Sequence, residues 1–170
     1  MRHLAFPLCL MAFWTTSVPA AVVLPLGLEA KYSMADRVVH ARVRAVSAIL
    51  DEGSAYVRSE ITLEVIRAWK GPSAASLVVH RAGGTSGRLT TWGEGLHPYR
   101  EGDEVVLFLE ARHDGGWVSI GVGIGTYAIE DGIARCPAGG PDAGPEPWAV
   151  FQNKLAALLA STGEPAPVVP

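Results

Sequence analysis

The sequence has very little cysteine. Its 170 residues include two cysteines, Cys9 and Cys136, and the first lies in an apolar segment near the start of the chain. A chain that has lost this start keeps only Cys136, which excludes an internal disulfide, so the domain must be held together by packing. Cys136 is interpreted as a structural or incidental thiol, with a covalent bond to a partner as the alternative.

The chain also lacks a surplus of positive charge. Its 14 Lys and Arg residues are outnumbered by 17 Asp and Glu residues, and the formal net charge is −3. Nucleic acids and anionic membrane surfaces bind clustered basic side chains. The charge balance therefore argues against both classes of partner.

Long uninterrupted apolar runs are missing as well. Prolines divide the apolar start, so no clean stretch of about 20 apolar residues remains for a membrane-spanning helix. A short basic region, an apolar segment over 4–14 and small or moderate residues over 18–20 are typical of a signal peptide. We expect cleavage between Ala20 and Ala21, a secreted or periplasmic location and no transmembrane segment afterwards. A retained membrane anchor is the alternative.

Catalytic and metal-binding motifs are absent from the sequence. No serine lies in a G-x-S-x-G elbow, and the histidines beyond the signal segment show no H-x-x-x-H spacing. A zinc site needs three or four converging ligands. No catalytic residue, metal or cofactor is therefore assigned, and we expect a protein that is not an enzyme.

One stretch does imitate a nucleotide site. Residues 123–128, GIGTYA, have the G-x-G-x-x-G/A spacing of a dinucleotide-binding turn. Such a turn must open a helix, whereas Asp131-Gly132 predicts another hairpin. We interpret Gly121, Gly123 and Gly125 as positions that let a strand curve, with no dinucleotide bound.

Hydrophobic periodicity predicts a mostly β fold. Strands are expected over 37–46, 57–70, 76–81, 105–109 and from 117 onward. The continuous apolar run over 105–109 indicates a strand covered on both faces. One face of the second strand is predicted to carry Val57, Ile61, Leu63, Val65 and Trp69. The fold class is therefore a five-stranded OB-like barrel with a short N-terminal helix around 26–35 and a C-terminal amphipathic helix.

The predicted domain organisation follows from these segments. It comprises a signal peptide over 1–20, the barrel domain over 21–135, a Pro/Gly-rich linker over 136–147, the helix over 148–162 and a disordered tail over 163–170. The helix carries an apolar stripe, which we expect to cover an open end of the barrel. Its residues are Trp148, Phe151, Leu155, Leu158 and Leu159.

Several local motifs also resemble a known group of proteins. They are an A-D-x-V-V strand from Ala35, an x-x-W-K-G strand end at Gly71, Gly83-Gly84, and a G-D/E-x-V-x-x-F-L strand from Gly102. The layout over 28–129 resembles that of uncharacterised exported bacterial proteins and is similar to the N-terminal domain of tissue inhibitors of metalloproteinases and to netrin-like modules. The resemblance implies a barrel. It does not carry over the inhibitory mechanism, because this chain has no cysteine near Ala21.

The segment from Gly83 to Asp103 is the candidate binding region. It is long, Gly-rich and without periodicity, and such connections are often functional or mobile. Its aromatic and cationic side chains form a composition that is enriched at binding surfaces. These candidate residues are Trp92, His97, Tyr99, Arg88 and Arg100. The alternative is that Trp92 and Tyr99 pack beneath the segment as a small additional core.

These observations favour an exported, non-enzymatic domain that binds a protein or a glycan outside the cytoplasm. An inhibitor or accessory protein of a secreted metalloprotease is the alternative, acting through a surface other than its N-terminus. An enzyme whose site the sequence does not reveal is a third hypothesis.

Overall fold

The structure is a computed structural model that describes residues 26–50, 56–72, 74–91 and 98–163. Two α-helices, α1 (Leu28–Met34) and α2 (Trp148–Thr162), and a short 3-10 helix, η1 (Ile120–Gly123), are present in these ranges. The strands are β1 (Arg37–Leu50), β2 (Val57–Lys70), β3 (Ser76–Ala82), β4 (Gly84–Ser86), β5 (Leu89–Thr91), β6 (Glu104–Ala111), β7 (Trp117–Ser119), β8 (Thr126–Glu130), β9 (Ile133–Arg135) and β10 (Glu146–Pro147).

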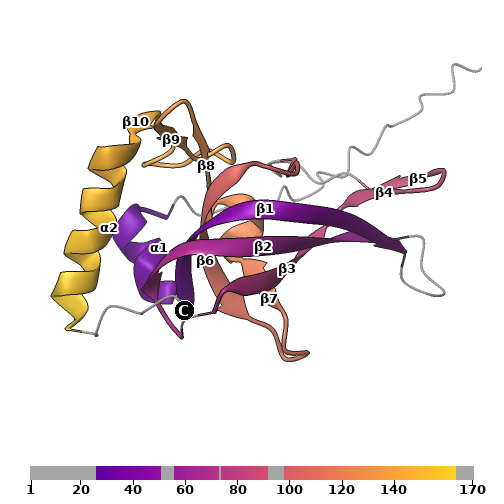
Figure 1. Cartoon of the computed structure of the whole chain (residues 1–170), viewed down its shortest axis with the longest axis horizontal. Helices are drawn as coiled ribbons and strands as arrows, with labels where there is room; N and C mark the ends of the chain where they lie inside the picture. The colour runs from indigo at the N-terminus through magenta and orange to yellow at the C-terminus, as the bar shows by residue number, and fades with distance from the viewer. Residues whose placement is uncertain (1–25, 51–55, 73, 92–97, 164–170) are drawn as a thin grey trace, which may run out of the picture.

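Five of these strands close into a barrel (Figure 1). Their order is β1-β2-β3-β7-β6, and β6 pairs again with β1. The contact between β3 and β7 is parallel, with Val79 opposite Trp117, whereas the other neighbours in the barrel are antiparallel. The mostly β fold, the closed five-stranded barrel and the two helices that the sequence predicts are confirmed, and the barrel is of mixed type.

The alternation of side chains along β6 separates two hydrophobic cores. Val105, Leu107 and Leu109 face the barrel interior, where they pack with side chains from β1, β2 and β3. Val106 and Phe108 point to the opposite face and pack under the helices. The prediction that this apolar run is covered on both faces is therefore correct.

The C-terminal helix covers the outside of the barrel wall. Phe151 and Leu155 of α2 are buried against Val38, Phe108 and Tyr127, which point outward from β1, β6 and β8. Trp148, Leu158 and Leu159 are partly buried in the same cluster. The expectation that the stripe closes an open end of the barrel is wrong, because the stripe covers the outer face of the barrel wall. Figure 1 shows α2 on this face, beside α1.

The predicted face of β2 is wrong at Trp69. Register shifts in the pairing of β1 with β2 place Val39 opposite Ala68 but Val38 opposite Lys70, so Trp69 is an extra residue in a β-bulge. An earlier shift, with Ala41 opposite Val65 but His40 opposite Arg67, makes Ile66 an extra residue as well. This first insertion reverses the alternation, so that Ala68 faces the barrel interior and Trp69 the outer core. Simple alternation along the strand does not include such an insertion.

The segment from Gly83 to Asp103 contains secondary structure that its composition does not predict. β4 and β5 form a two-stranded antiparallel sheet with Arg88 in the turn between them. Figure 1 shows this hairpin projecting from the barrel on the side away from α1 and α2. Residues 92–97 lie outside the described ranges.

The glycine stretch is not one curved strand. β7 ends at Ser119, η1 follows, and a new strand, β8, begins at Thr126. Gly121 and Gly123 have φ angles of +57° and +105°, which L side chains rarely adopt. The glycines therefore allow a tight turn between two strands, and the chain continues as β8 where a dinucleotide turn would open a helix.

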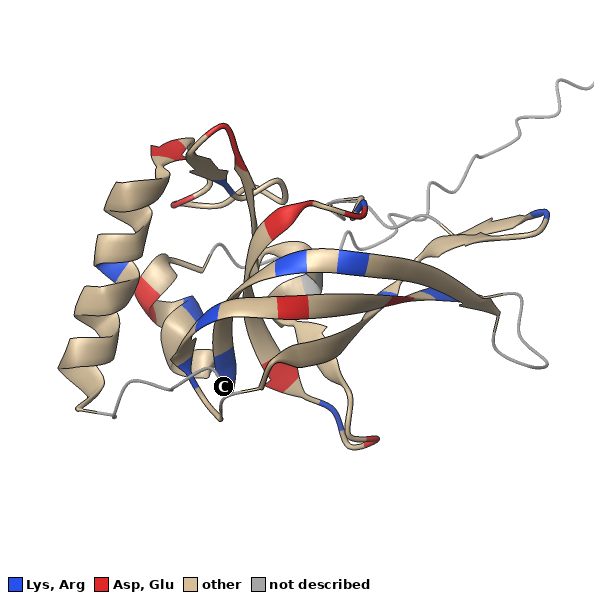
Figure 2. Cartoon of the chain, viewed as in Figure 1, with Lys and Arg blue, Asp and Glu red and all other residues tan. Residues whose placement is uncertain are grey.

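Charged side chains of both signs are spread over the barrel wall, with Lys and Arg on β1 and both signs on β2 (Figure 2). Within the described ranges, no helix has both the length and the apolar character needed to cross a membrane.

Candidate functional site

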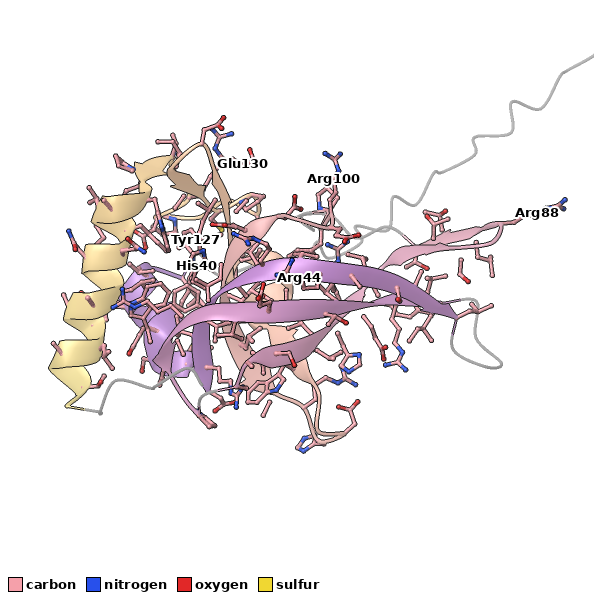
Figure 3. The ribbon with its side chains drawn as sticks, in the orientation of Figure 1. His40, Arg44, Arg88, Arg100, Tyr127 and Glu130 are labelled. Carbon is pink, nitrogen blue, oxygen red and sulfur yellow. The ribbon has the colours of Figure 1, made fainter. Side chains whose placement is uncertain are left out.

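The five candidate residues of the sequence do not form one cluster. Figure 3 shows Arg88 at the tip of the projecting hairpin, while Arg100 points to solvent from a separate part of the chain. Trp92 and His97 lie outside the described residues. Tyr99 is half-buried and packs against the core of the barrel interior. Of the described candidates, Tyr99 alone lies at a cavity.

Tyr99 is held by contacts of its hydroxyl and of its ring. Its hydroxyl lies 3.0 Å from the hydroxyl of Thr126, and the guanidinium carbon of Arg81 lies 5.3 Å from the ring centroid. Burial raises the pKa of the Tyr99 phenol, although the bond to Thr126 and the nearby Arg81 oppose this shift. The phenol is therefore neutral at physiological pH and available as a hydrogen-bonding group.

Two cavities share Arg81 and Tyr99 as a common wall. The first, which we call the hairpin cavity, has a volume of about 410 Å³ and lies between the distal half of β1 and the β4–β5 hairpin. The second, which we call the glycine-turn cavity, has a volume of about 350 Å³ and lies between β3 and the turn around η1. Both volumes fall at the lower end of the range of about 300–1,000 Å³ that is usual for small-molecule sites.

Hydroxyl groups line both cavities. Ser59, Thr85, Thr90 and Thr91 contribute to the hairpin cavity. Ser119 and Thr126 contribute to the glycine-turn cavity, and their hydroxyls lie 3.1 Å apart. Since Thr126 also contacts Tyr99, three hydroxyls form a continuous chain across the wall of this cavity.

Arg81 provides a positive charge at the boundary between the cavities. It follows Leu77 and Val79 on the inward face of β3, and its side chain is half-buried at the end of the barrel interior. Burial lowers the pKa of the guanidinium, and the nearby Tyr99 opposes this change. A guanidinium nevertheless stays protonated in proteins, so Arg81 is a permanent cation.

The glycines of the turn around η1 form part of the glycine-turn cavity. Gly121 and Gly123 line it, together with His80 and Arg112. Because these glycines have no side chains, they leave space for the cavity. Their left-handed backbone conformations disfavour substitution by a larger residue. The residues that imitate a nucleotide motif thus shape a cavity in the wall of the barrel.

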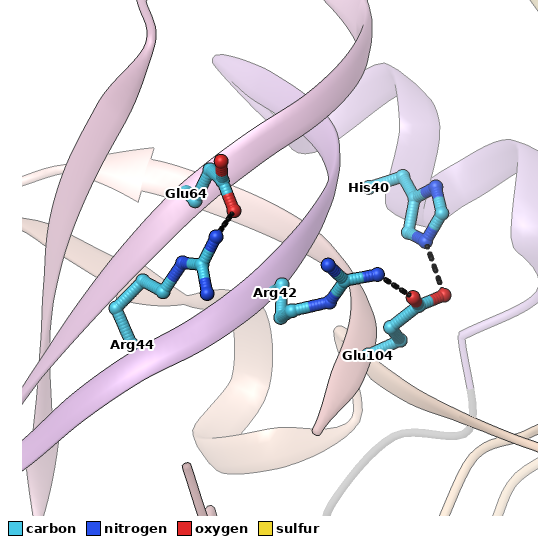
Figure 4. A network of polar contacts seen from close by, with 5 residues as sticks. All are labelled: His40, Arg42, Arg44, Glu64 and Glu104. Atoms are coloured by element: carbon cyan, nitrogen blue, oxygen red, sulfur yellow. Dashed lines mark hydrogen bonds and ion pairs between the residues drawn. The ribbon is translucent and has the colours of Figure 1, made fainter. Parts of the chain in front are cut away.

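A network of charged side chains lies elsewhere, on the outer surface of β1 (Figure 4). Glu104 accepts hydrogen bonds from Arg42 and His40, and Arg44 pairs with Glu64. Burial lowers the pKa of His40, although its contact with Glu104 opposes the shift. These charges neutralise one another, and the described linings of the two cavities do not include them.

A larger hollow of about 600 Å³ lies beside α1 and α2. Two of its polar side chains already have partners, because Asp142 accepts a bond from the Leu28 amide and Lys154 pairs with Glu146. Beneath the helices, the Lys31 ammonium donates to the Tyr127 hydroxyl at 2.7 Å. These contacts join α1 to β8 and to the segment before β10, and α2 to β10, and they are assigned to stability.

Within the described part of the chain, His, Cys, Asp and Glu side chains form no group of three or more that could hold a metal ion. Cys136 is buried, and its thiol lies 3.4 Å from the Ile124 carbonyl oxygen. Burial raises the pKa of this thiol, although Lys31 opposes the shift. A raised pKa keeps the thiol protonated and reduces its nucleophilicity.

Comparison with models of known protein families finds no match, and no curated protein is significantly similar to the chain. The arguments for its function therefore rest on the chain's own residues.

Sequence reasoning missed most of the residues that form the two cavities. A signal for Arg81 was present, since it continues the inward alternation of Leu77 and Val79 on β3. An arginine at such a position is unusual, because inward positions of a strand usually carry apolar side chains. The neighbourhood of Tyr99, Ser119 and Thr126 depends on tertiary pairing and has no local signal.

Proposed function

We propose that the chain is an exported, non-enzymatic binding domain that holds a protein or a glycan outside the cytoplasm. Its binding site consists of the hairpin cavity and the glycine-turn cavity. The observation that carries the proposal is that both cavities meet at Arg81 and Tyr99, a cation and an aromatic hydroxyl on adjoining parts of the barrel. Concave sites with a few convergent polar groups are where ligands usually bind.

Binding, rather than catalysis, is favoured by the contacts within the site. The hydroxyls of Ser119 and Thr126 bond to each other, and that of Thr126 also contacts Tyr99. An activated nucleophile requires an adjacent base such as a histidine or a carboxylate. The contacts of these hydroxyls suit recognition of a polar ligand.

The position of the cavities also supports the proposal. OB-like barrels often bind oligosaccharides or oligonucleotides next to the loops that join their first and second and their fourth and fifth strands. Here the hairpin cavity includes Val46 and Ala48 in the distal half of β1, and the glycine-turn cavity includes Arg112 beside the loop between β6 and β7. This support is an analogy between folds.

Export is part of the same proposal and rests on the signal-like features of residues 1–20. The resemblance to exported bacterial proteins and to the inhibitor and netrin-like modules supports a barrel that serves as a binding scaffold. A secreted metalloprotease captured as the partner would instead favour the alternative function of an inhibitor or accessory protein.

The proposal is tested by filling each cavity. Ala48→Trp occupies the hairpin cavity and Val118→Phe the glycine-turn cavity, because both residues line the respective space. Ala45→Trp is the matched control for the first variant, since Ala45 is also an exposed alanine of β1 but lies outside the described linings.

The exported chain and its variants are immobilised and exposed separately to extracytoplasmic proteins and to surface polysaccharides. We expect the parent and Ala45→Trp to retain the same partner, and at least one cavity-filling variant to lose it while unfolding at an unchanged urea concentration. Retention of every partner by both cavity-filling variants would refute the proposed site.

A further inference from the structure

We propose that the wall shared by the two cavities recognises an acidic sugar, with Arg81 pairing with the carboxylate of a uronic acid unit. This inference rests on the proposed binding function and specifies the chemical class of its ligand. It depends on the placement of Arg81, on the charge of the two cavities and on the hydroxyl groups around them.

Arg81 occupies an unusual place on β3. Most of the inward positions of the barrel strands carry apolar side chains. On β3 these are Leu77 and Val79, yet the next inward position is occupied by Arg81. Its guanidinium packs over the ring of Tyr99, which fixes the charge at the boundary of the two cavities. A guanidinium has five N–H donors and can bind a planar carboxylate through two of them in addition to other contacts.

Arg81 also carries the charge that suits an acidic ligand. Among the described residues that line the hairpin cavity, Arg81 is the one side chain that is charged at neutral pH. The described lining of the glycine-turn cavity adds Arg112 and Glu110, and Arg112 pairs with Asp114, so these side chains add no positive charge to that of Arg81. Arg81 is therefore the permanent cation that the described linings of both cavities share. A guanidinium in this position is suited to an anionic group of a ligand.

Hydroxyl groups are concentrated around both cavities. The chain of Ser119, Thr126 and Tyr99 faces one cavity, and Thr85, Thr90 and Thr91 face the other. A hydroxyl donates one hydrogen bond and accepts two, so these groups have capacity beyond their mutual contacts. Sugar hydroxyls have the same dual character and match a wall of this kind.

A peptide fits the site less well. Peptides that bind through their main chain add to an exposed strand edge. β3, which carries Arg81, is paired with β2 along its length, with Ser59 opposite Arg81, and with β7 at Val79 on the other side. The hydroxyl-lined cavities therefore favour a saccharide over an added strand, and binding of a peptide is an outcome of the test.

The test uses trimers of galacturonic, glucuronic and mannuronic acid, each beside the same trimer with its carboxyl groups reduced to alcohols. Reduction removes the charge and retains the ring, so each pair isolates the contribution of the carboxylate. Affinities for the exported chain are measured by titration calorimetry at low and at physiological salt. We expect at least one acidic trimer to bind ten-fold or more tightly than its reduced form, with a difference that shrinks as salt rises.

Variants assign this preference to Arg81. Arg81→Gln should reduce the ratio of acidic to neutral affinity to near one, whereas Arg81→Lys should retain part of it because the charge remains. Tyr99→Phe keeps the aromatic ring under Arg81 and removes the hydroxyl, so it should weaken both forms alike. Arg88→Gln is the matched control, because it removes the same charge from the exposed tip of the hairpin.

Equal affinity for acidic and reduced trimers, binding of no trimer, or an equal loss in Arg88→Gln and Arg81→Gln would overturn the inference. If Arg81→Gln fails to fold, the comparison of acidic with reduced trimers and the Tyr99→Phe variant still decide it. Should a captured peptide or neutral glycan depend on the cavities while no acidic trimer binds, the proposed function would stand and the acidic ligand would be refuted.

Discussion

The buried contact between Lys31 and Tyr127 allows a quantitative test of how α1 is attached to the barrel. The Lys31 side chain is 0% exposed and Tyr127 is 1% exposed. The ammonium donates to the phenol oxygen at 2.7 Å and lies 4.7 Å from the centroid of the same ring. Burial lowers the pKa of Lys31, although Cys136 and Asp142 oppose this shift. The charge is therefore costly to bury and depends on its partner.

The perturbation is Tyr127→Phe, which removes one oxygen and leaves the ring in place. A hydrogen bond to a charged group contributes about 1.5–3 kcal/mol, so the variant should lose about that much free energy of unfolding. In a Lys31→Met background the ammonium is absent and the phenol has already lost this donor. There the same change should be nearly neutral or stabilising.

The assay is urea unfolding of the parent, the two single variants and the double variant. The double-mutant cycle should give a coupling of about 1.5–3 kcal/mol between the two side chains, with unchanged denaturant slopes. Additive effects, with a coupling below about 0.5 kcal/mol, would refute the reasoning, because groups without an interaction show additivity within that range.

Three further predictions concern the turn, the pH response and processing. Gly125→Ala should cost about 1–3 kcal/mol, since a Cβ would lie 2.9 Å from the Phe108 carbonyl oxygen, whereas Gly144→Ala, with nothing within 4 Å, should stay within about 0.5 kcal/mol in the same urea assay. Burial lowers the pKa of His40, and the nearby Arg42 and Arg67 lower it further, whereas the contact with Glu104 opposes the shift. As the pH falls, the His40 imidazole is therefore protonated in the unfolded chain before it is protonated in the folded one. Stability should therefore fall as pH drops through about 6.5, and His40→Gln should reduce that slope in urea titrations. Intact-mass analysis of the exported protein should give a chain that begins at Ala21, and a product that retains Met1 in the membrane fraction would contradict processing.

The parts of the fold that depend on periodicity could be predicted from the sequence. The alternation in β1 and β2, the apolar run of β6 and the stripe of α2 identify their elements, because each pattern reflects burial along a regular structure. Trp69 departs from its pattern because an extra residue at Ile66 reverses the alternation of β2 ahead of it. The β4–β5 hairpin has strands of three residues each, too short to show a period.

The candidate site was harder to predict than the fold. Tyr99 was recognised as an aromatic residue in a long Gly-rich segment, but composition does not show which neighbours it meets. Its contacts with Arg81 and Thr126 join positions that are 18 and 27 residues away in the sequence. Such contacts exist because the barrel closes, so they require the pairing of β3, β6 and β7 rather than any local pattern.

The central claim is that the two cavities around Arg81 and Tyr99 form the binding site. The most direct measurement is NMR chemical-shift mapping of the isotope-labelled exported chain, titrated with the partner that the immobilised chain captures. The account predicts the largest amide shifts at Arg81, Tyr99, Thr126 and the β4–β5 hairpin, with little change along α2. Shifts concentrated on α1 and α2, with none around Arg81 and Tyr99, would contradict it.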